Sequence, residues 1–243
     1  MIRLDQLLVQ RGLFESRSRA RDAIERGTVT VAGGVAVKAG QIVDEAIEIT
    51  VDDPAQHYVS RAALKLIAAL DHFGLSPEGL FCLDVGASTG GFTQVLLERG
   101  AAHVTALDVG HAQLDQKLRN DPRVTDIEGL NARNLTQGDL STLTQAIVSD
   151  VSFISLKLAL PPALALAEAG AWVVMLVKPQ FEAGRENVGK GGMLKDPSSG
   201  PQIAADLEAW LNSLGGWQSF GVIPSPIAGG DGTQEYLLAG RKA

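Results

Sequence analysis

Strand-like and helical segments alternate along most of the sequence, and this alternation constrains the fold more than any other feature. The strand-like segments are 80–84, 104–108, 146–150 and 172–177, and the helical ones include 92–99 and the stretch around 155–169. Repetition of strand, helix and strand predicts a mainly parallel α/β sheet with helices on both faces. Ligands of such sheets bind at the carboxyl ends of the strands, where this sequence has Asp84, Asp108, Asp150 and Lys178.

The composition is that of a globular protein with an apolar core. Hydrophobic residues make up 45% of the 243 residues and charged residues 20%, which excludes a disordered or fibrous chain. The single cysteine, Cys82, excludes a disulfide framework, and the four scattered histidines give no metal-ligand cluster. The most apolar region, 156–177, is interrupted by Lys157, Glu168 and a proline pair, so we expect no membrane span. The N-terminus lacks a secretory signal, and we expect a cytoplasmic protein.

Charge is distributed unevenly along the chain. The whole sequence has a formal charge of −7, with 28 acidic and 21 basic residues, whereas residues 1–26 hold six arginines against four acidic residues. An arginine cluster on an otherwise acidic protein indicates a dedicated anion-binding surface, for which nucleic acid is the usual partner.

The first 51 residues show the pattern of a small α+β module. Apolar spacing predicts one helix that ends at Gly12 and a second helix that begins after an N-cap, Ser16, and ends at Gly27. After Gly27 the apolar period changes to two, which is typical of strands. The predicted strands are 28–31, 35–37 and 47–51, the first two forming a hairpin.

This order of elements resembles the S-four-like fold, a small RNA-binding module named after a protein of the small ribosomal subunit. The segments that carry the resemblance are 3–8, 16–20, 24–27 and 29–31. The resemblance implies RNA binding through arginines, since the planar guanidinium grips phosphate in two places. The predicted RNA-binding residues are Arg3, Arg17, Arg19, Arg21 and Arg26, with Arg61 farther along the chain. Arginines on an amphipathic helix are also typical of a solvated helix face, which is the alternative interpretation.

The polar, proline-containing segment 52–57 indicates a boundary between this module and the rest of the chain. We expect an RNA-binding domain at 1–53, a linker at 54–60 and a second domain at 61–243.

Residues 84–93 follow a predicted strand and open a predicted helix, which is the position of a ligand-binding loop. Glycines let the backbone approach a ligand closely, but Ser88 stands where a dinucleotide fingerprint requires glycine, and there is no Walker lysine. Asp84 before the first glycine and Asp108 at the end of the next strand favour S-adenosylmethionine, a cofactor with an adenosine and a cationic amino group. The alternative is a tight turn in any nucleotide-type fold. The predicted cofactor-binding residues are Asp84, Gly86, Ser88, Thr89, Gly90, Gly91, Phe92, Asp108 and Asn131.

Several segments, in chain order, are similar to those of the TlyA family, also called the hemolysin A family. They are 58–65, 84–93, 131–135, 149–156, 178–182, 225–227 and 235–238, so the resemblance covers essentially the whole chain. It implies an S-four-like module joined to an FtsJ-like methyltransferase with a Rossmann-like sheet. The activity implied is methylation of ribose 2′-hydroxyls in ribosomal RNA, at cytidine, with S-adenosylmethionine as the methyl donor.

FtsJ-like enzymes carry a Lys-Asp-Lys-Glu tetrad, and the matching residues here are Lys65, Asp150, Lys178 and Glu235. A ribose hydroxyl is a poor nucleophile until its proton is removed, so the hypothesis is that Lys178 takes this proton. Asp150 and Glu235 would position the two lysines, and Lys65 would steady the ribose oxygen or a phosphate. A lysine base needs a pKa below its ordinary value of about 10.4. Taken singly, Lys65 also fits a basic helix face, and Asp150 also fits a helix cap.

Three classes of function are compatible with these features. The first is an RNA 2′-O-methyltransferase that acts on ribosomal RNA or ribosomal subunits, and the presence of all four tetrad residues favours it. The second is a catalytically silent RNA-binding or ribosome-assembly protein that has kept the fold. The third is a membrane-active hemolysin, which no segment of the sequence supports. The sequence does not indicate an oligomeric state.

Overall fold

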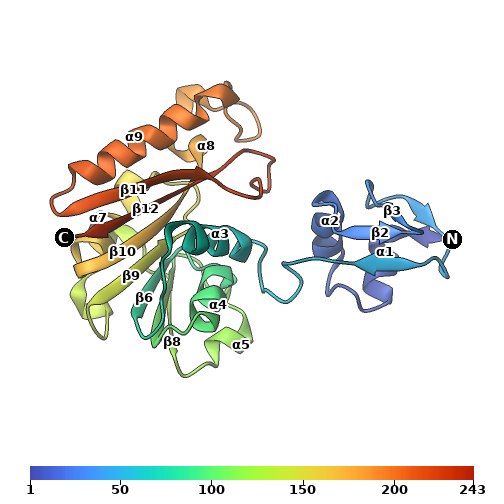
Figure 1. Cartoon of the computed structure of the whole chain (residues 1–243), viewed down its shortest axis with the longest axis horizontal. Coiled ribbons are helices and arrows are strands. Elements are labelled where there is room, and N and C mark those ends of the chain that lie inside the picture. Colours follow the sequence, from blue (N-terminus) through green and yellow to red (C-terminus); the bar gives the residue numbers. More distant parts are fainter. The chain divides into compact units, whose positions relative to one another are not determined.

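The computed structural model describes all 243 residues, and its internal contacts divide the chain into two compact units, Met1–His57 and Tyr58–Ala243. Figure 1 shows the helices and strands of each unit. We refer to them as the N-terminal unit and the sheet unit.

The N-terminal unit has the two helices predicted from the sequence, packed beside small sheets. The helices are α1 (Leu4–Gln10) and α2 (Arg17–Glu25), and the Ser16 side chain caps α2 by accepting the Arg19 N–H at 3.3 Å. A three-stranded antiparallel sheet has the order β3-β2-β5, with β2 at Val29–Val31, β3 at Gly34–Val35 and β5 at Ile49–Val51. A further pair, β1 (Ile2–Arg3) and β4 (Ile42–Val43), was not predicted.

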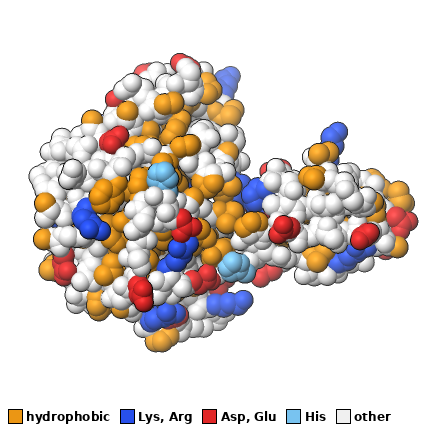
Figure 2. Space-filling view, viewed as in Figure 1, with side chains coloured by type: hydrophobic (Ala, Val, Ile, Leu, Met, Phe, Trp, Pro, Cys, Tyr) orange, Lys and Arg blue, Asp and Glu red, His pale blue; other side chains and the backbone are white.

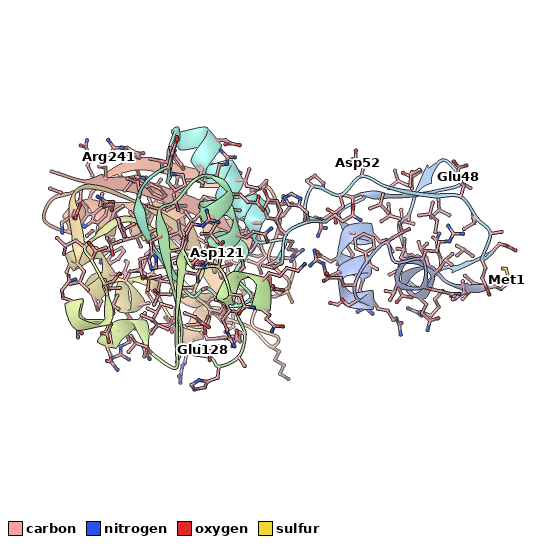
Figure 3. All side chains as sticks on the ribbon, turned by 90° about the horizontal axis from the view of Figure 1, so that it is seen from below. Met1, Glu48, Asp52, Asp121, Glu128 and Arg241 are labelled. Atoms are coloured by element: carbon pink, nitrogen blue, oxygen red, sulfur yellow. The ribbon has the colours of Figure 1, made fainter.

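The sheet unit is built on seven strands in the order β11-β12-β10-β9-β6-β7-β8. Their bounds are β6 Phe81–Val85, β7 His103–Asp108, β8 Val124–Glu128, β9 Thr144–Ser149, β10 Ala167–Val177, β11 Trp217–Pro224 and β12 Tyr236–Lys242. Strands β10, β9, β6, β7 and β8 pair in parallel, whereas β12 runs antiparallel to both of its neighbours. Figure 3 labels Asp121, which precedes the edge strand β8, and Glu128, the last residue of that strand. The mostly parallel α/β fold predicted from the alternation is thereby confirmed.

Helices cover both faces of this sheet. The longer helices are α3 (Ala63–Phe73), α4 (Gly91–Glu98) and α9 (Gly200–Ser213). The shorter ones are α5 (Gln116–Arg119), α6 (Leu156–Ala159), α7 (Pro161–Ala165) and α8 (Pro179–Glu182), with single 3₁₀ turns at Ala132–Asn134, Gln137–Asp139, Arg185–Asn187 and Pro197–Ser199. None of these helices has the length and apolar composition needed to cross a bilayer.

Two hydrophobic clusters separate the faces, because side chains alternate along each strand. One cluster joins α3 and α4 to strand residues such as Cys82, Val148 and Leu176. The other joins α6, α7 and α9 to the alternate residues, such as Leu83 and Ile147. Residues 84, 150 and 178 have the same parity along their strands as the first set, so they point toward the α3 face.

The region 155–169 differs from the prediction. The sequence predicts one helical stretch and a strand from Trp172, whereas the structure has two short helices and a strand β10 that already begins at Ala167. The proline pair at 161–162 explains the division, since proline is accommodated in the first turn of a helix but breaks a helix interior. The pairing of β10 with β9 is irregular between Ala167 and Trp172.

Candidate active site

The register of the central strands brings two tetrad positions together at one edge of the sheet. In the antiparallel pair of β10 and β12, Val177 lies opposite Tyr236, so the next residue, Lys178, comes opposite Glu235. In the parallel pair of β10 and β9, Met175 lies beside Ser149, which places Asp150 on the same edge. The carboxyl ends of β9 and β10 therefore deliver Asp150 and Lys178 to one place.

Lys178 is held by the segment that follows β9. Its Nζ lies 2.5 Å from Asp150 Oδ1 and donates a hydrogen bond to Ser152 Oγ at 2.8 Å. The Lys178 side chain is 12% exposed, so part of it remains accessible to solvent. An amine in this place can exchange protons with a bound substrate.

Lys65 and Glu235 form a second ion pair, buried beside the first. The Lys65 ammonium, from the first turns of α3, donates to Glu235 Oε2, and the two residues are only 5% and 3% exposed. Burial raises the pKa of Glu235 above its ordinary value, and the neighbouring Lys65 and Lys178 oppose that rise. Since Lys178 and Asp150 both act on the Glu235 carboxylate, the four tetrad side chains form one electrostatic cluster.

A cavity of about 640 Å³ opens next to this cluster. Asp108 lies on its wall, and the carboxylate accepts the N–H groups of Ser88 and Gly110, both at 2.8 Å. Each carboxylate oxygen keeps a further lone pair that can accept a hydroxyl. The rest of the lining combines apolar side chains with polar loops from several strand ends; it includes Val85, Gly86, Leu107, Val109, Leu130, Asn131, Asp150, Phe153 and Leu158.

A smaller cavity of about 80 Å³ lies against the loop that follows β6. Ser88, Thr89, Gly91 and Phe92 from this loop line it, together with Ser60. Gly86, Ser88 and Asp150 line both cavities, so the two spaces adjoin at the tetrad.

Gly86 is the position in this loop where a side chain has no room. Its φ is +85°, and a Cβ there would lie 2.8 Å from the carbonyl oxygen of Asp150. Glycine therefore lets the cofactor loop and the Asp150 segment approach each other, which places the cavity beside Lys178.

Asp84 lies beneath the loop rather than on a cavity wall. It is fully buried, and its Oδ2 accepts the Thr93 hydroxyl at 2.7 Å, while its Oδ1 has no donor. Burial raises the pKa of Asp84 to about 7. Gly90, with φ +98°, packs closely against Leu114 and Leu118 and also lies off both cavities. These two predicted residues therefore support the loop from behind, whereas Asn131 and Asp108 face the larger cavity.

Phe153 is a residue of this site that the sequence interpretation missed. Its side chain is 89% exposed, its φ is +65°, and its ring lies 5.1 Å from the ring of Phe181 between centroids. An exposed aromatic ring on the cavity lining, next in sequence to the Ser152 that contacts Lys178, offers a surface on which a nucleobase can stack. The available signal was an aromatic residue in the short segment between Asp150 and the helix that follows.

The predicted RNA-binding arginines differ in what their guanidiniums contact. Arg3 and Arg17 both donate to the fully buried Asp5, and Arg26, only 11% exposed, pairs with Asp22 and Asp53. Arg21 is exposed and has no carboxylate within ion-pair distance. Figure 2 shows basic and acidic side chains interspersed on the visible face of each unit.

Two further arginines donate to backbone carbonyls within their own units. Arg19 donates to the carbonyls of Ala55 and Gln56, and its guanidinium is also paired with Glu15. Arg61, one turn before Lys65, donates to the carbonyl of Ala228 at 3.3 Å. Both arginines thus have a structural role in addition to any contact with a ligand.

Comparisons with known proteins match both units. The family model of FtsJ-like methyltransferases matches residues 58–242, and the S4 domain matches residues 2–48. The 16S/23S rRNA (cytidine-2'-O)-methyltransferase TlyA of Mycobacterium tuberculosis is 46% identical over 97% of this chain and 88% of its own length. Hemolysin A of Brachyspira hyodysenteriae is 43% identical over 97% of this chain and 98% of its own. A solved Streptococcus thermophilus chain described as a hemolysin has a TM-score of 0.76 at 40% identity, over 99% of this chain and 88% of that one.

Proposed function

The chain belongs to the FtsJ-like methyltransferase family, with relatives of the TlyA and hemolysin A type, and from this premise we propose that it methylates ribose 2′-hydroxyls of ribosomal RNA. The family resemblance predicted from the sequence is confirmed. The proposed substrate nucleotide is cytidine, because the Mycobacterium tuberculosis relative is named for that reaction. The proposed methyl donor is S-adenosylmethionine.

The observation that carries the proposal is the position of the tetrad beside the larger cavity. Asp150 belongs to both: it pairs with Lys178 and lines the cavity. An amine that can hold a proton is therefore next to a space large enough for a nucleoside-sized ligand. Holding two reactants in such proximity supplies much of the rate enhancement of a transfer reaction.

The residues of the cavity fit S-adenosylmethionine. Asp108 has spare lone pairs for ribose hydroxyls, and the apolar lining with Asn131 suits an adenine ring. Asp84 Oδ1, a buried acceptor without a donor, lies beneath the loop where the cationic amino group is expected, and such a cation would favour the ionised form of this carboxyl. When bound, this cofactor supplies a methyl group already activated on a positively charged sulfur.

In the proposed mechanism Lys178 holds the proton of the ribose 2′-hydroxyl. Asp150 and Ser152 fix the amine through the contacts at 2.5 and 2.8 Å, so its lone pair, when neutral, has a defined direction. Lys65 remains paired with Glu235 and has further N–H donors for the ribose oxygen or a nearby phosphate. Phe153 offers its exposed ring to a nucleobase taken out of its stack.

For RNA binding we propose a reduced set of arginines in the N-terminal unit. Arg21 carries most of the phosphate contact because its guanidinium is exposed and unpaired. Arg3 and Arg17 are 40% and 48% exposed and can share their remaining donors with phosphate. Arg26 acts mainly within the unit through its two carboxylate partners.

The test is methyl transfer from labelled S-adenosylmethionine to ribosomal subunits and to free ribosomal RNA, followed by mass spectrometry of the modified nucleotide. The expected product is 2′-O-methylcytidine in one or both subunits. RNA binding without transfer to any substrate would support the silent-protein alternative, and a methyl group on a base would contradict the ribose assignment. A liposome leakage assay, for which we expect no release, tests the hemolysin alternative.

A further inference from the structure

Helix α8, a single turn of four residues, follows Lys178 directly and lies between the two loops that carry the tetrad carboxylates. Every second residue from position 178 to position 182 contacts a different part of the sheet unit. Lys178 contacts Asp150, Gln180 contacts Asp231, and Glu182 contacts the start of α6. The function described above uses only the first of these contacts.

Gln180 connects α8 to the loop that precedes Glu235. Its Nε2 donates to Asp231 Oδ2 at 3.1 Å, and Asp231 Oδ1 in turn accepts the Thr233 N–H at 2.9 Å. Gln180 is 7% exposed, and its Oε1 has no donor, so this amide is kept in the interior at a cost in free energy. The loop is compact around Glu235, since a Cβ on Gly229 would lie 2.9 Å from both Glu235 Oε1 and Asp231 Oδ1.

Glu182 connects α8 to the segment that carries Asp150. Its carboxylate accepts the Ser155 hydroxyl at 2.6 Å and the Leu156 N–H at 2.8 Å. It has no lysine or arginine within ion-pair distance, and burial raises its pKa above the ordinary value. A carboxylate held by two neutral donors fixes the end of the segment in which Ser152 and Phe153 lie.

We propose that Gln180 and Glu182 are positioning residues that set the two tetrad carboxylates relative to Lys178. Gln180 holds the loop before Glu235, and Glu182 holds the Asp150 segment. Both residues belong to α8, the short helix that directly follows Lys178. Arg61 restrains the Glu235 loop from its other side, through the Ala228 carbonyl. This inference rests on the proposed function, because it assigns the two residues a purpose in methyl transfer.

The Gln180–Asp231 contact can be tested by exchanging donor and acceptor. Gln180→Glu places two carboxylates together, and Gln180→Glu combined with Asp231→Asn restores a hydrogen bond of reversed direction. We expect Gln180→Glu to lower kcat about tenfold to a hundredfold, because the repulsion displaces Glu235 from its place beside Lys65 and Lys178. The kcat of the double variant should recover to within about threefold of wild type. The KM for RNA and the Kd for S-adenosylmethionine stay within about twofold, since neither residue lines a cavity.

The matched control is Gln202→Glu. Gln202 donates to Asp206 at 2.9 Å on the exposed face of α9, so the same chemical change occurs away from the tetrad. Its kcat is expected to equal that of wild type. Thermal unfolding of all variants is followed in parallel, and recovery of kcat in the double variant without a change in Tm distinguishes positioning from general stability.

Glu182→Gln provides a second, independent test. Glutamine removes the charge that strengthens both hydrogen bonds, and it keeps the Ser155 contact only if that hydroxyl reverses to accept from the amide nitrogen. We expect kcat to fall about threefold to tenfold with an unchanged cofactor Kd. Glu182→Ala removes both hydrogen bonds, and its kcat is expected to be lower still.

The inference is overturned if Gln180→Glu and Glu182→Gln both turn over as wild type does, or if the Gln180→Glu defect persists in the double variant. Either result leaves the proposed function intact. A wild-type protein that transfers no methyl group contradicts the proposed function itself, and the two failures are therefore distinguishable.

Discussion

Two buried carboxylates, one in each unit, face basic side chains and behave in opposite ways. Asp5 in the N-terminal unit is fully buried, and hydrogen bonds from Arg3 and Arg17 lower its pKa to about 2. Glu235 in the sheet unit is also buried and faces Lys65, but burial raises its pKa. The difference lies in which effect dominates: burial outweighs the lysine charges at Glu235, whereas the hydrogen bonds from two arginines outweigh burial at Asp5.

Two guanidiniums supply several directed N–H bonds and remain charged at any ordinary pH, so Asp5 stays ionised and its cluster serves as a structural joint. Lysine supplies one compact ammonium without the planar fork of arginine, so Glu235 receives fewer directed hydrogen bonds than Asp5 does. The arginine cluster around Asp5 thus holds its own unit together, whereas the lysine-paired Glu235 belongs to the candidate active site. The following experiments test this difference between the two clusters.

Lys178→Ala is expected to have the largest effect. Removal of the amine that holds the ribose proton should lower methyl transfer by about 10²–10⁴-fold, the contribution of a positioned base. The Kd for S-adenosylmethionine, measured by calorimetry, should stay near that of wild type. Lys117→Ala, on the exposed face of α5, is the control and should retain full activity. Undiminished turnover by Lys178→Ala would contradict the role of the lysine cluster.

Gly86→Ala is expected to act on cofactor binding. A methyl group 2.8 Å from the Asp150 carbonyl, at φ +85°, forces the loop and the Asp150 segment apart. We expect the Kd for S-adenosylmethionine to rise about tenfold or more, the equivalent of strain of 1–3 kcal/mol. Gly138→Ala, whose nearest neighbour is the Thr136 hydroxyl at 3.6 Å, is the control. Equal affinity in both variants would show that this close approach does not shape the cavity.

Asp5→Asn tests the structural cluster. Loss of charge-assisted hydrogen bonds should destabilise the N-terminal unit by about 1.5–3 kcal/mol, seen as faster hydrogen exchange in α1 and α2 of the full chain. Glu48→Gln, an exposed carboxylate labelled in Figure 3, is the control. If Asp5→Asn exchanged its α1 and α2 amides at wild-type rates, the Asp5 cluster would have no structural role of this kind.

The same carboxylate predicts a pH dependence. The pKa of Asp5 is lower in the folded state than its ordinary value of 3.8, so its contribution is complete above that value. The contribution is lost as the pH falls from about 4 toward about 2, through the folded pKa. Hydrogen exchange of α1 should therefore accelerate over this range in wild type and change less in Asp5→Asn.

The smallest effects are expected from Arg21→Ala and Arg26→Ala. Comparing the two variants separates a loss of RNA binding from a loss of stability. Removing one phosphate contact should weaken RNA binding a few-fold and reduce the slope of log affinity against log salt by about 1. Arg26→Ala should instead lower stability, because Asp53, which is 2% exposed, loses its partner. The reverse pattern would show that Arg26 leaves its carboxylates to bind RNA.

The sequence predicted the sheet unit well where local pattern and strand ends determine position. Apolar strands alternate with helices, so Asp108, Asp150 and Lys178 were expected on one edge and are found there. Pattern could not reveal that Arg17 pairs with Asp5 and Arg26 with Asp53, because these contacts join residues 12 and 27 positions apart and form only through tertiary packing. It also could not reveal the positive φ of Phe153. The pairing of β1 with β4 was missed because two-residue strands leave no period to detect.

Strand β12 is the last of the sheet in chain order, yet it lies inside the sheet between β10 and β11, and Glu235 directly precedes it. The strand that follows this carboxylate is therefore held by backbone pairing along both of its edges. A slip of β12 by one residue against its neighbours would turn each of its side chains to the opposite face of the sheet. The counterion of Lys65 is thus in place only when this inner strand has paired in the observed register.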